Sequence, residues 1–340
     1  MTRTATARRL AAGAAFGGGS VALGGAALVA LLREEARAAR RNIESRTDKG
    51  GPPSSDGIYG RGKSKPLVFT VLGDSSAVGL GVERASEAPG ALIAAALSEL
   101  AERPVRLVCV AVSGARSSAL ESQVEKALAE QPDVALIMIG ANDVTSRTRP
   151  VVSVRHLADA VRRLTTAGTE VVVGTCPDLG TIRPIAQPLR ILARRWSRQL
   201  AAAQTIAVVE AGGRTVSLGS VLGPAFASDR DMFSVDEFHP SAVGYAQAAA
   251  VLLPSVADAV GVWPASADRG RRPIRRGTVR PVAKAAARAA SRTGTEVQPA
   301  EVRGSDTGPR GPWALLRRRP RPEILSADQA EEVTAPEVAG

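Results

Sequence analysis

The sequence has few aromatic residues, few cysteines and few histidines. Each scarcity excludes one feature: an aromatic core, a disulfide framework or a histidine-rich metal site. Aromatic residues make up 3% of the 340 residues, so we expect an aliphatic core of Val, Ile, Leu and Ala. Two cysteines, Cys109 and Cys176, cannot form a disulfide framework, and we expect both to be buried free thiols. Two histidines, with no cluster of His, Cys or spaced acidic residues, predict no metal site. The Gly-Leu-Gly run at residues 79–81 is too short for a phosphate-binding fingerprint, so no cofactor is predicted.

Positive charge is in excess, with a formal net charge of +11, but it is unevenly distributed. Residues 269–321 carry 15 Lys and Arg against three acidic residues, so the rest of the chain is close to neutral. Apolar periodicity ends near residue 263, and we interpret residues 263–340 as a disordered basic tail. Such a tail is either a solvated extension or a contact for an anionic surface such as lipid headgroups. Trp313 is the only aromatic residue of the Arg-rich part, which argues against nucleic acid as a partner.

The first 46 residues contain the longest uncharged stretch, residues 10–32. As a helix, this stretch is long enough to cross a bilayer core of ~30 Å. Three interpretations stay open: a retained signal-anchor, a signal peptide cleaved near Ala36-Arg37-Ala38, and a soluble Ala-rich helix. The first two favour an extracytoplasmic protein that is membrane-anchored or secreted. Arginines stand on both sides of the stretch, so they do not fix its orientation.

Residues 47–65 have the Gly, Pro and Ser content of a linker, and the folded domain is expected at residues 66–262. Within it, short apolar runs alternate with segments of helical periodicity. We expect strands at 68–72, 105–112, 134–139, 171–174 and 206–209, and helices at 91–100, 118–130, 153–167, 188–203 and 241–260. This alternation predicts an α/β domain with a five-stranded, mostly parallel sheet covered by helices on both faces.

Four short blocks follow strands of this sheet or precede its last helix. Gly73-Asp74-Ser75 follows the first strand, Gly114 follows the second, and Gly140-Ala141-Asn142-Asp143 follows the third. Asp236-Glu237-Phe238-His239 stands ahead of the final helix. Because the carboxyl ends of parallel strands meet at one edge of the sheet, we expect the first three blocks to lie there together.

The blocks supply the groups that acyl-ester chemistry needs. A serine hydroxyl such as that of Ser75 is a weak nucleophile until a base takes its proton. His239 is the candidate base, because His156 lies inside an expected helix and far from any strand end. Asp236, three residues before His239, can orient the ring and stabilise its charged form.

Other residues of the blocks suit an oxyanion hole. The backbone N–H of Gly114 and the side-chain amide of Asn142 can donate to a tetrahedral intermediate, and the loss of one such donor typically costs ~10²–10³ in rate. Asp74 and Asp143 are expected to support the loops rather than to act on the substrate.

With these four blocks, residues 66–262 resemble the SGNH/GDSL hydrolase superfamily of esterases and lipases. The resemblance implies a three-layer α/β/α fold with a flavodoxin-like sheet. It also implies Ser75 as nucleophile, His239 as base and Asp236 as its partner, with the N–H groups of Ser75 and Gly114 and the side chain of Asn142 as the oxyanion hole. The sequence lacks the G-x-S-x-G elbow of other α/β hydrolases.

We therefore predict a serine esterase that hydrolyses acyl or acetyl esters of a lipid, a glycan or a small molecule through an acyl-enzyme. Two alternatives stay open: an O-acyltransferase that uses the same residues, and a non-catalytic, membrane-attached binding protein. The segment 178–187 is expected to shape the pocket.

Overall fold

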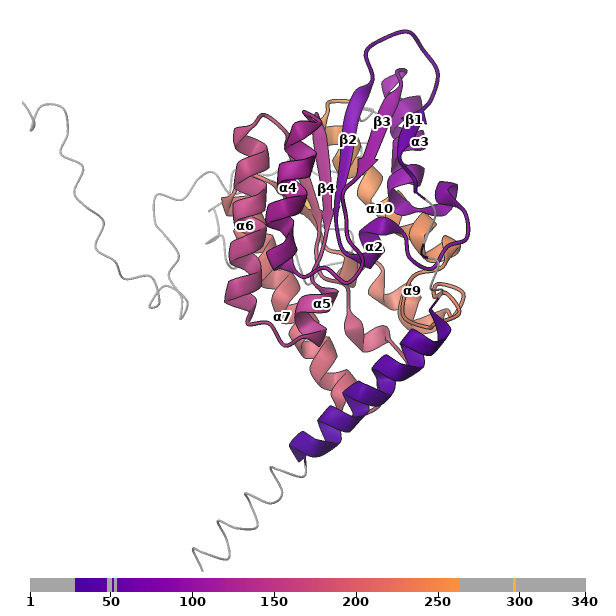
Figure 1. Cartoon of the computed structure of the whole chain (residues 1–340), viewed down its shortest axis with the longest axis vertical. Coiled ribbons are helices and arrows are strands. Elements are labelled where there is room, and N and C mark those ends of the chain that lie inside the picture. Colours follow the sequence, from indigo (N-terminus) through magenta and orange to yellow (C-terminus); the bar gives the residue numbers. More distant parts are fainter. Residues whose placement is uncertain (1–27, 48–50, 52–53, 263–295, 298–340) are drawn as a thin grey trace, which may run out of the picture.

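A single sheet of seven strands runs through the part of the chain that the computed structural model describes, which is residues 28–47, 51, 54–262 and 296–297 (Figure 1). The strand order is β1-β3-β2-β4-β5-β6-β7. The five central strands are parallel: β2 (Leu67–Gly73), β3 (Val105–Cys109), β4 (Val134–Met138), β5 (Glu170–Gly174) and β6 (Arg214–Val216). Their order is that of flavodoxin-like folds, in which the chain reverses direction across the sheet after the first two strands. The parallel five-stranded core is confirmed.

Both faces of the central strands are apolar because both are covered. Every residue of β2 and β4 is buried. Phe69 and Val71 pack on one side of the sheet, whereas Leu72 packs on the other. Such near-continuous apolar runs are typical of parallel strands buried on both sides.

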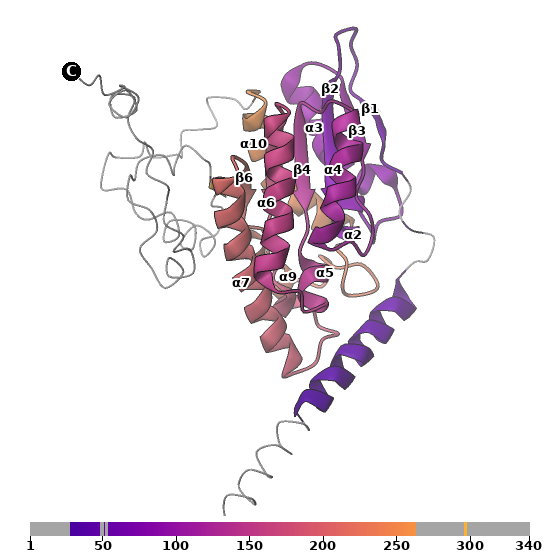
Figure 2. The same ribbon diagram turned by 60° about the vertical axis from the view of Figure 1, so that its left-hand side comes forward.

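Helices form a layer on each face of the sheet (Figures 1 and 2). One layer consists of α3 (Pro89–Ala101) and α10 (Ala242–Ala259), and the other of α4 (Leu120–Ala129), α6 (Pro150–Thr166) and α7 (Leu189–Glu210). Short helices occupy the connections: α2 (Ser75–Val78), η1 (Ala85–Glu87), η2 (Ser117–Ala119), α5 (Ala141–Thr145), η3 (Leu179–Thr181), α8 (Leu218–Val221) and α9 (Gly223–Ser228). The predicted three-layer α/β/α arrangement is confirmed.

The predicted fifth strand at residues 206–209 is wrong. These residues form the last turns of α7, and the fifth parallel strand is β6 (Arg214–Val216). The β-branched residues of this segment suggested a strand, but Val208 and Val209 extend the buried helical face that begins at Leu189. Packing of that face against α6 and the sheet outweighs the local strand preference.

Two antiparallel edge strands were not anticipated from the sequence. β1 (Gly57–Tyr59) pairs with β3 and lies within the segment that was expected to be a linker. β7 (Glu296–Val297) pairs with β6 and comes from the expected tail. The other residues of that tail, 263–295 and 298–340, lie outside the described part of the chain.

Among the described residues, α10 is the only helix long and apolar enough to cross a membrane. It packs on α3 and the sheet, so it is a core helix of the domain. Residues 10–27 of the uncharged N-terminal stretch lie outside the described part, and residues 28–32 begin a helix that ends at residue 46.

Both cysteines are free, as predicted. Cys109 ends β3 and Cys176 follows β5, and two other strands separate them in the sheet. Burial raises the pKa of Cys109 to about 11 and raises that of Cys176 well above its usual value. Both thiols are therefore protonated at neutral pH.

Candidate active site

Hydrogen bonds connect the side chain of Ser75 to that of His239, and His239 to Asp236. The Nε2 atom of His239 lies 3.0 Å from Oγ of Ser75, and its Nδ1 atom lies 2.6 Å from Oδ2 of Asp236. All three side chains are buried. With Nδ1–H donated to the carboxylate, Nε2 is left to accept the serine proton. His156 lies in α6 and lines neither of the two cavities that adjoin Ser75.

Asp236 is held as an ion by its hydrogen bonds. Its Oδ1 atom accepts from the hydroxyl of Ser234 and from the backbone N–H groups of Phe238 and His239, at 2.7–2.9 Å. Burial by itself would raise the pKa of Asp236, but the hydrogen bonds from His239 and the neighbouring backbone outweigh burial and hold the pKa well below its usual range. The carboxylate is thus charged wherever His239 would act as a base.

Ser75 is presented by a tight turn at the end of β2. Gly73 has φ +137°, and a Cβ there would lie 1.9 Å from the carbonyl oxygen of Met138, so only glycine fits. Asp74 then caps α2 by accepting from the N–H and the hydroxyl of Ser76. Burial raises the pKa of Asp74. These hydrogen bonds hold the start of the turn that carries Ser75.

The three expected oxyanion donors surround the space beside the serine hydroxyl. Within the described part of the chain, the backbone N–H groups of Ser75 and Gly114 donate to no protein acceptor. Asn142 donates one amide hydrogen to the carbonyl of Ala115 at 3.1 Å, which leaves its second hydrogen for a ligand. All three residues line the same cleft.

Asp143 connects the loops that carry these donors. One of its oxygens accepts from the N–H and hydroxyl of Ser117, and the other accepts from the hydroxyl of Ser153. Ser117 follows the Gly114 loop and Ser153 belongs to α6, so the buried carboxylate holds both against the Asn142 turn.

Two buried glutamines also hold the strand ends, and sequence reasoning missed them. Gln123 of α4 accepts from the N–H of Gly73 and donates to its carbonyl. Gln204 of α7 accepts from the N–H of Cys176 and donates to the carbonyl of Ile139. A polar residue on the apolar face of a helix was the available signal, because a buried amide needs specific partners.

Two cavities meet at Ser75. A narrow one of about 100 Å³ is mostly apolar, and its lining includes Met138, Ile182, Leu222, Phe226 and Phe233. A wide cleft of about 820 Å³ is lined by Ser75, Gly114 and Asn142, the three expected oxyanion donors. Ser75 and His239 border both spaces, so a bound ester can extend in two directions from the serine.

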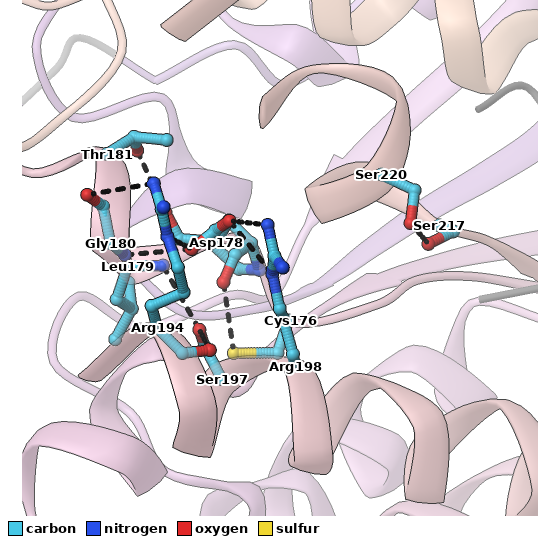
Figure 3. Close-up of polar contacts among 11 residues, drawn as sticks. Cys176, Asp178, Leu179, Gly180, Thr181, Arg194, Ser197, Arg198, Ser217 and Ser220 are labelled. Atoms are coloured by element: carbon cyan, nitrogen blue, oxygen red, sulfur yellow. Dashed lines mark hydrogen bonds and ion pairs between the residues drawn. The ribbon is translucent and has the colours of Figure 1, made fainter. Parts of the chain in front are cut away.

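The loop after β5 forms one wall of the narrow cavity and is fixed to α7 (Figure 3). The buried carboxylate of Asp178 accepts from the N–H of Gly180 and pairs with Arg198 at 2.9 Å and with Arg194 at 3.5 Å. Leu179 donates its N–H to the hydroxyl of Ser197. These contacts order the start of the segment 178–187, which was expected to shape the pocket.

Known proteins have sequences similar to that of this chain. The model of the GDSL-like lipase/acylhydrolase family matches residues 71–247. A GDSL-like esterase of Mycobacterium tuberculosis is 44% identical over 273 residues, which cover 76% of this chain and 85% of the relative.

Solved structures of similar proteins were also found. A lipase/acylhydrolase from Enterococcus faecalis has a TM-score of 0.46 and 21% identity, and the match covers 56% of this chain and 95% of the other. The acetylxylan esterase Axe2 from Geobacillus stearothermophilus has a TM-score of 0.43 and 19% identity, and the match covers 57% of this chain and 94% of the other.

The family match spans all four sequence blocks, from the turn before Ser75 to His239. Together with the curated relative, it favours ester hydrolysis over acyl transfer and over a non-catalytic binding role. The chain belongs to the GDSL-like lipase/acylhydrolase family and is a serine hydrolase that acts on ester bonds.

Proposed function

We propose that Ser75 is the nucleophile of this esterase, that His239 is its base and that Asp236 orients His239. The observation that carries the proposal is the continuous line of hydrogen bonds, 3.0 Å from serine to histidine and 2.6 Å from histidine to aspartate. Geometry of this kind suits a serine whose proton is removed as it attacks a carbonyl carbon.

The reaction proceeds in two halves. Ser75 Oγ bonds to the ester carbon while His239 Nε2 takes its proton, and the N–H groups of Ser75, Gly114 and Asn142 stabilise the oxyanion. His239 then gives that proton to the departing alcohol, leaving an acyl group on Ser75. A water molecule, deprotonated by His239, attacks the acyl carbon, and the acid leaves as His239 returns the proton to Ser75.

The two cavities suit the two halves of the ester. Alcohol must leave and water must enter while the acyl group stays on Ser75, so the wide cleft suits the alcohol and the narrow cavity suits the acyl group. The narrow cavity, at about 100 Å³, is smaller than a cavity of roughly 150 Å³ that holds benzene, so we expect an acyl chain of about two to four carbons.

The test is turnover of p-nitrophenyl acetate, butyrate and octanoate by the full-length chain. We expect hydrolysis of the two short esters, little hydrolysis of the octanoate, and loss of turnover in Ser75→Ala. Ser122→Ala is the matched control, because Ser122 is exposed and its hydroxyl donates only to the carbonyl of Ala119, just before α4. Full turnover in Ser75→Ala would refute the assignment.

We also propose that the N-terminal segment attaches the protein to a membrane and that the basic tail contacts an anionic surface. The uncharged stretch at residues 10–32 and the 15 basic residues at 269–321 support these roles. With these roles, we propose that the enzyme works outside the cytoplasm, at a membrane surface.

A further inference from the structure

A helix over residues 28–46 lies at the end of the molecule where α2 and α5 begin (Figures 1 and 2). Its face toward the domain carries Leu32, Ala36, Ala39 and Ile43, which recur every three or four residues and so share one side of the helix. Ala39 is buried, and Leu32 and Ala36 pack in the same apolar cluster as Leu189 and Phe238. This helix precedes the expected hydrolase domain, yet it lines the same cleft as Ser75.

Polar contacts hold the helix in its first half and at its last residue. Glu35 accepts from the N–H of Leu189 at 3.1 Å, and Leu189 is the first residue of α7, whose N-terminal N–H groups have no partner within that helix. Arg46 pairs with Glu237 at 3.5 Å. The second pair is exposed and contributes little by itself, but it lies next to Asp236.

The residue that follows the helix touches the catalytic carboxylate. The hydroxyl of Thr47 lies 3.0 Å from Oδ2 of Asp236, the same oxygen that accepts from His239. It also lies 2.8 Å from the carbonyl of Ile43, and one hydroxyl has one proton for these two acceptors. Hydrogen bonds to an ionised acceptor are the stronger ones, so the carboxylate is the preferred partner.

The same helix borders the wide cleft. Ala36, Ala39 and Ile43 line one side of this space, and Ile185, Leu189 and Trp196 are also in its lining. A cleft of about 820 Å³ lies in the usual size range of small-molecule sites, roughly 300–1,000 Å³. Arg40, Glu44 and Thr47 of the same helix also line the cleft. The apolar residues of the wall favour an alcohol half with an apolar surface of its own.

We propose that residues 28–47 are part of the active site: Thr47 positions the carboxylate of Asp236, and the helix face forms the wall that selects a bulky apolar alcohol. This inference rests on the proposed function, because it assigns the wide cleft to the alcohol. It also implies that cleavage near Ala36-Arg37-Ala38 would remove part of this wall, so the working enzyme retains the helix.

The positioning role is tested with Thr47→Val in the full-length chain, assayed with an acetate ester of a small alcohol and one of a bulky apolar alcohol. Val keeps the shape of Thr and removes the hydroxyl, so we expect kcat to fall about tenfold for both esters with KM unchanged. Thr47→Ser restores the hydroxyl and should restore kcat. Ser45→Ala is the control, because Ser45 is exposed and donates only to Asn42 of the same helix.

The selective role is tested with Ile43→Ala and the same two esters. Removal of half-buried apolar atoms from the wall should raise KM for the bulky ester about tenfold relative to the small one. A general loss of folding would instead lower turnover of both esters alike, and the ratio of their kcat/KM values would not move.

The proposal is overturned if Thr47→Val keeps wild-type kcat, or if Ile43→Ala turns over the small ester like the wild type and leaves the ratio unchanged. The proposed function is judged separately by Ser75→Ala. If Ser75→Ala is inactive while both N-terminal variants match the wild type, the esterase assignment stands and the role of residues 28–47 falls.

Discussion

At the residue scale, the side chain of Asp236 makes more hydrogen bonds than that of Ser75 or His239. Its Oδ1 accepts from three donors, and its Oδ2 receives the ring of His239 and the hydroxyl of Thr47. Only an ionised carboxylate can accept all of them. The charge of Asp236 and the orientation of His239 therefore depend on each other.

Replacing Asp236 with Asn should lower kcat by about 10⁴ without unfolding the chain. An amide presents a donor or a neutral acceptor to His239, so the ring is no longer fixed with Nε2 facing Ser75. Steady-state kinetics with p-nitrophenyl acetate measures the effect. Asp229→Asn, an exposed acid in the preceding loop, should behave as the wild type. A fall of less than tenfold in Asp236→Asn would contradict the assigned role.

The low pKa of Asp236 also predicts how stability depends on pH. Below its usual pKa of 3.8, the folded chain binds fewer protons at this group than the unfolded chain does. The stabilisation is complete above that value and is lost as pH falls through the lower folded pKa. Urea unfolding should show that the stability difference between wild type and Asp236→Asn shrinks below about pH 4. A difference that stays constant down to about pH 2 would argue against the lowered pKa.

At the element scale, buried amides connect the helices to the strand ends that carry the site. Gln123 satisfies both backbone groups of Gly73, directly before the turn to Ser75. Gln204 bonds the N–H of Cys176, just after β5, and the carbonyl of Ile139, just after β4. Each helix layer thus fixes a loop of the site as well as covering the sheet.

Gln123→Leu should destabilise the fold by roughly 1–3 kcal/mol, because it leaves the buried N–H of Gly73 without a partner. The carbonyl of Gly73 still accepts from the N–H of Val112. Urea unfolding of the full-length chain measures this change. Ser122→Ala, the exposed neighbour, should stay within about 0.5 kcal/mol of the wild type. A fully stable Gln123→Leu variant would mean that Gly73 finds another partner.

At the scale of the whole molecule, the positive charge of the chain is concentrated in one stretch of the sequence, residues 269–321, which follows all four sequence blocks of the site. Each Lys or Arg near an anionic bilayer contributes about 1 kcal/mol at low salt. A protein with such a basic stretch can associate with an anionic surface through it.

We expect seven Arg→Gln substitutions, at 271, 272, 275, 276 and 317–319, to reduce binding of the full-length chain to phosphatidylglycerol vesicles. The same seven positions changed to Lys keep the charge and should keep the binding. Co-sedimentation compares these vesicles with phosphatidylcholine vesicles, which separates charge from apolar insertion. Equal preference for anionic vesicles in the Gln and Lys variants would contradict a role for the charge.

The sequence by itself determined the alternation of strands and helices and the blocks around Ser75, Gly114, Asn142 and His239. These are local properties: the period of apolar residues, the glycines of tight turns and the spacing from Asp236 to His239 within one turn. Each is set by residues a few positions apart, so each can be read without knowing the rest of the fold.

Only the tertiary structure decided the rest. Residues 206–209 became helix because their apolar side chains have partners on α6 and the sheet. Thr47 meets Asp236 across 189 positions, and no pattern near either residue indicates that contact. Such contacts depend on how whole helices and strands pack together. That packing leaves no periodic pattern among neighbouring residues from which it could be predicted.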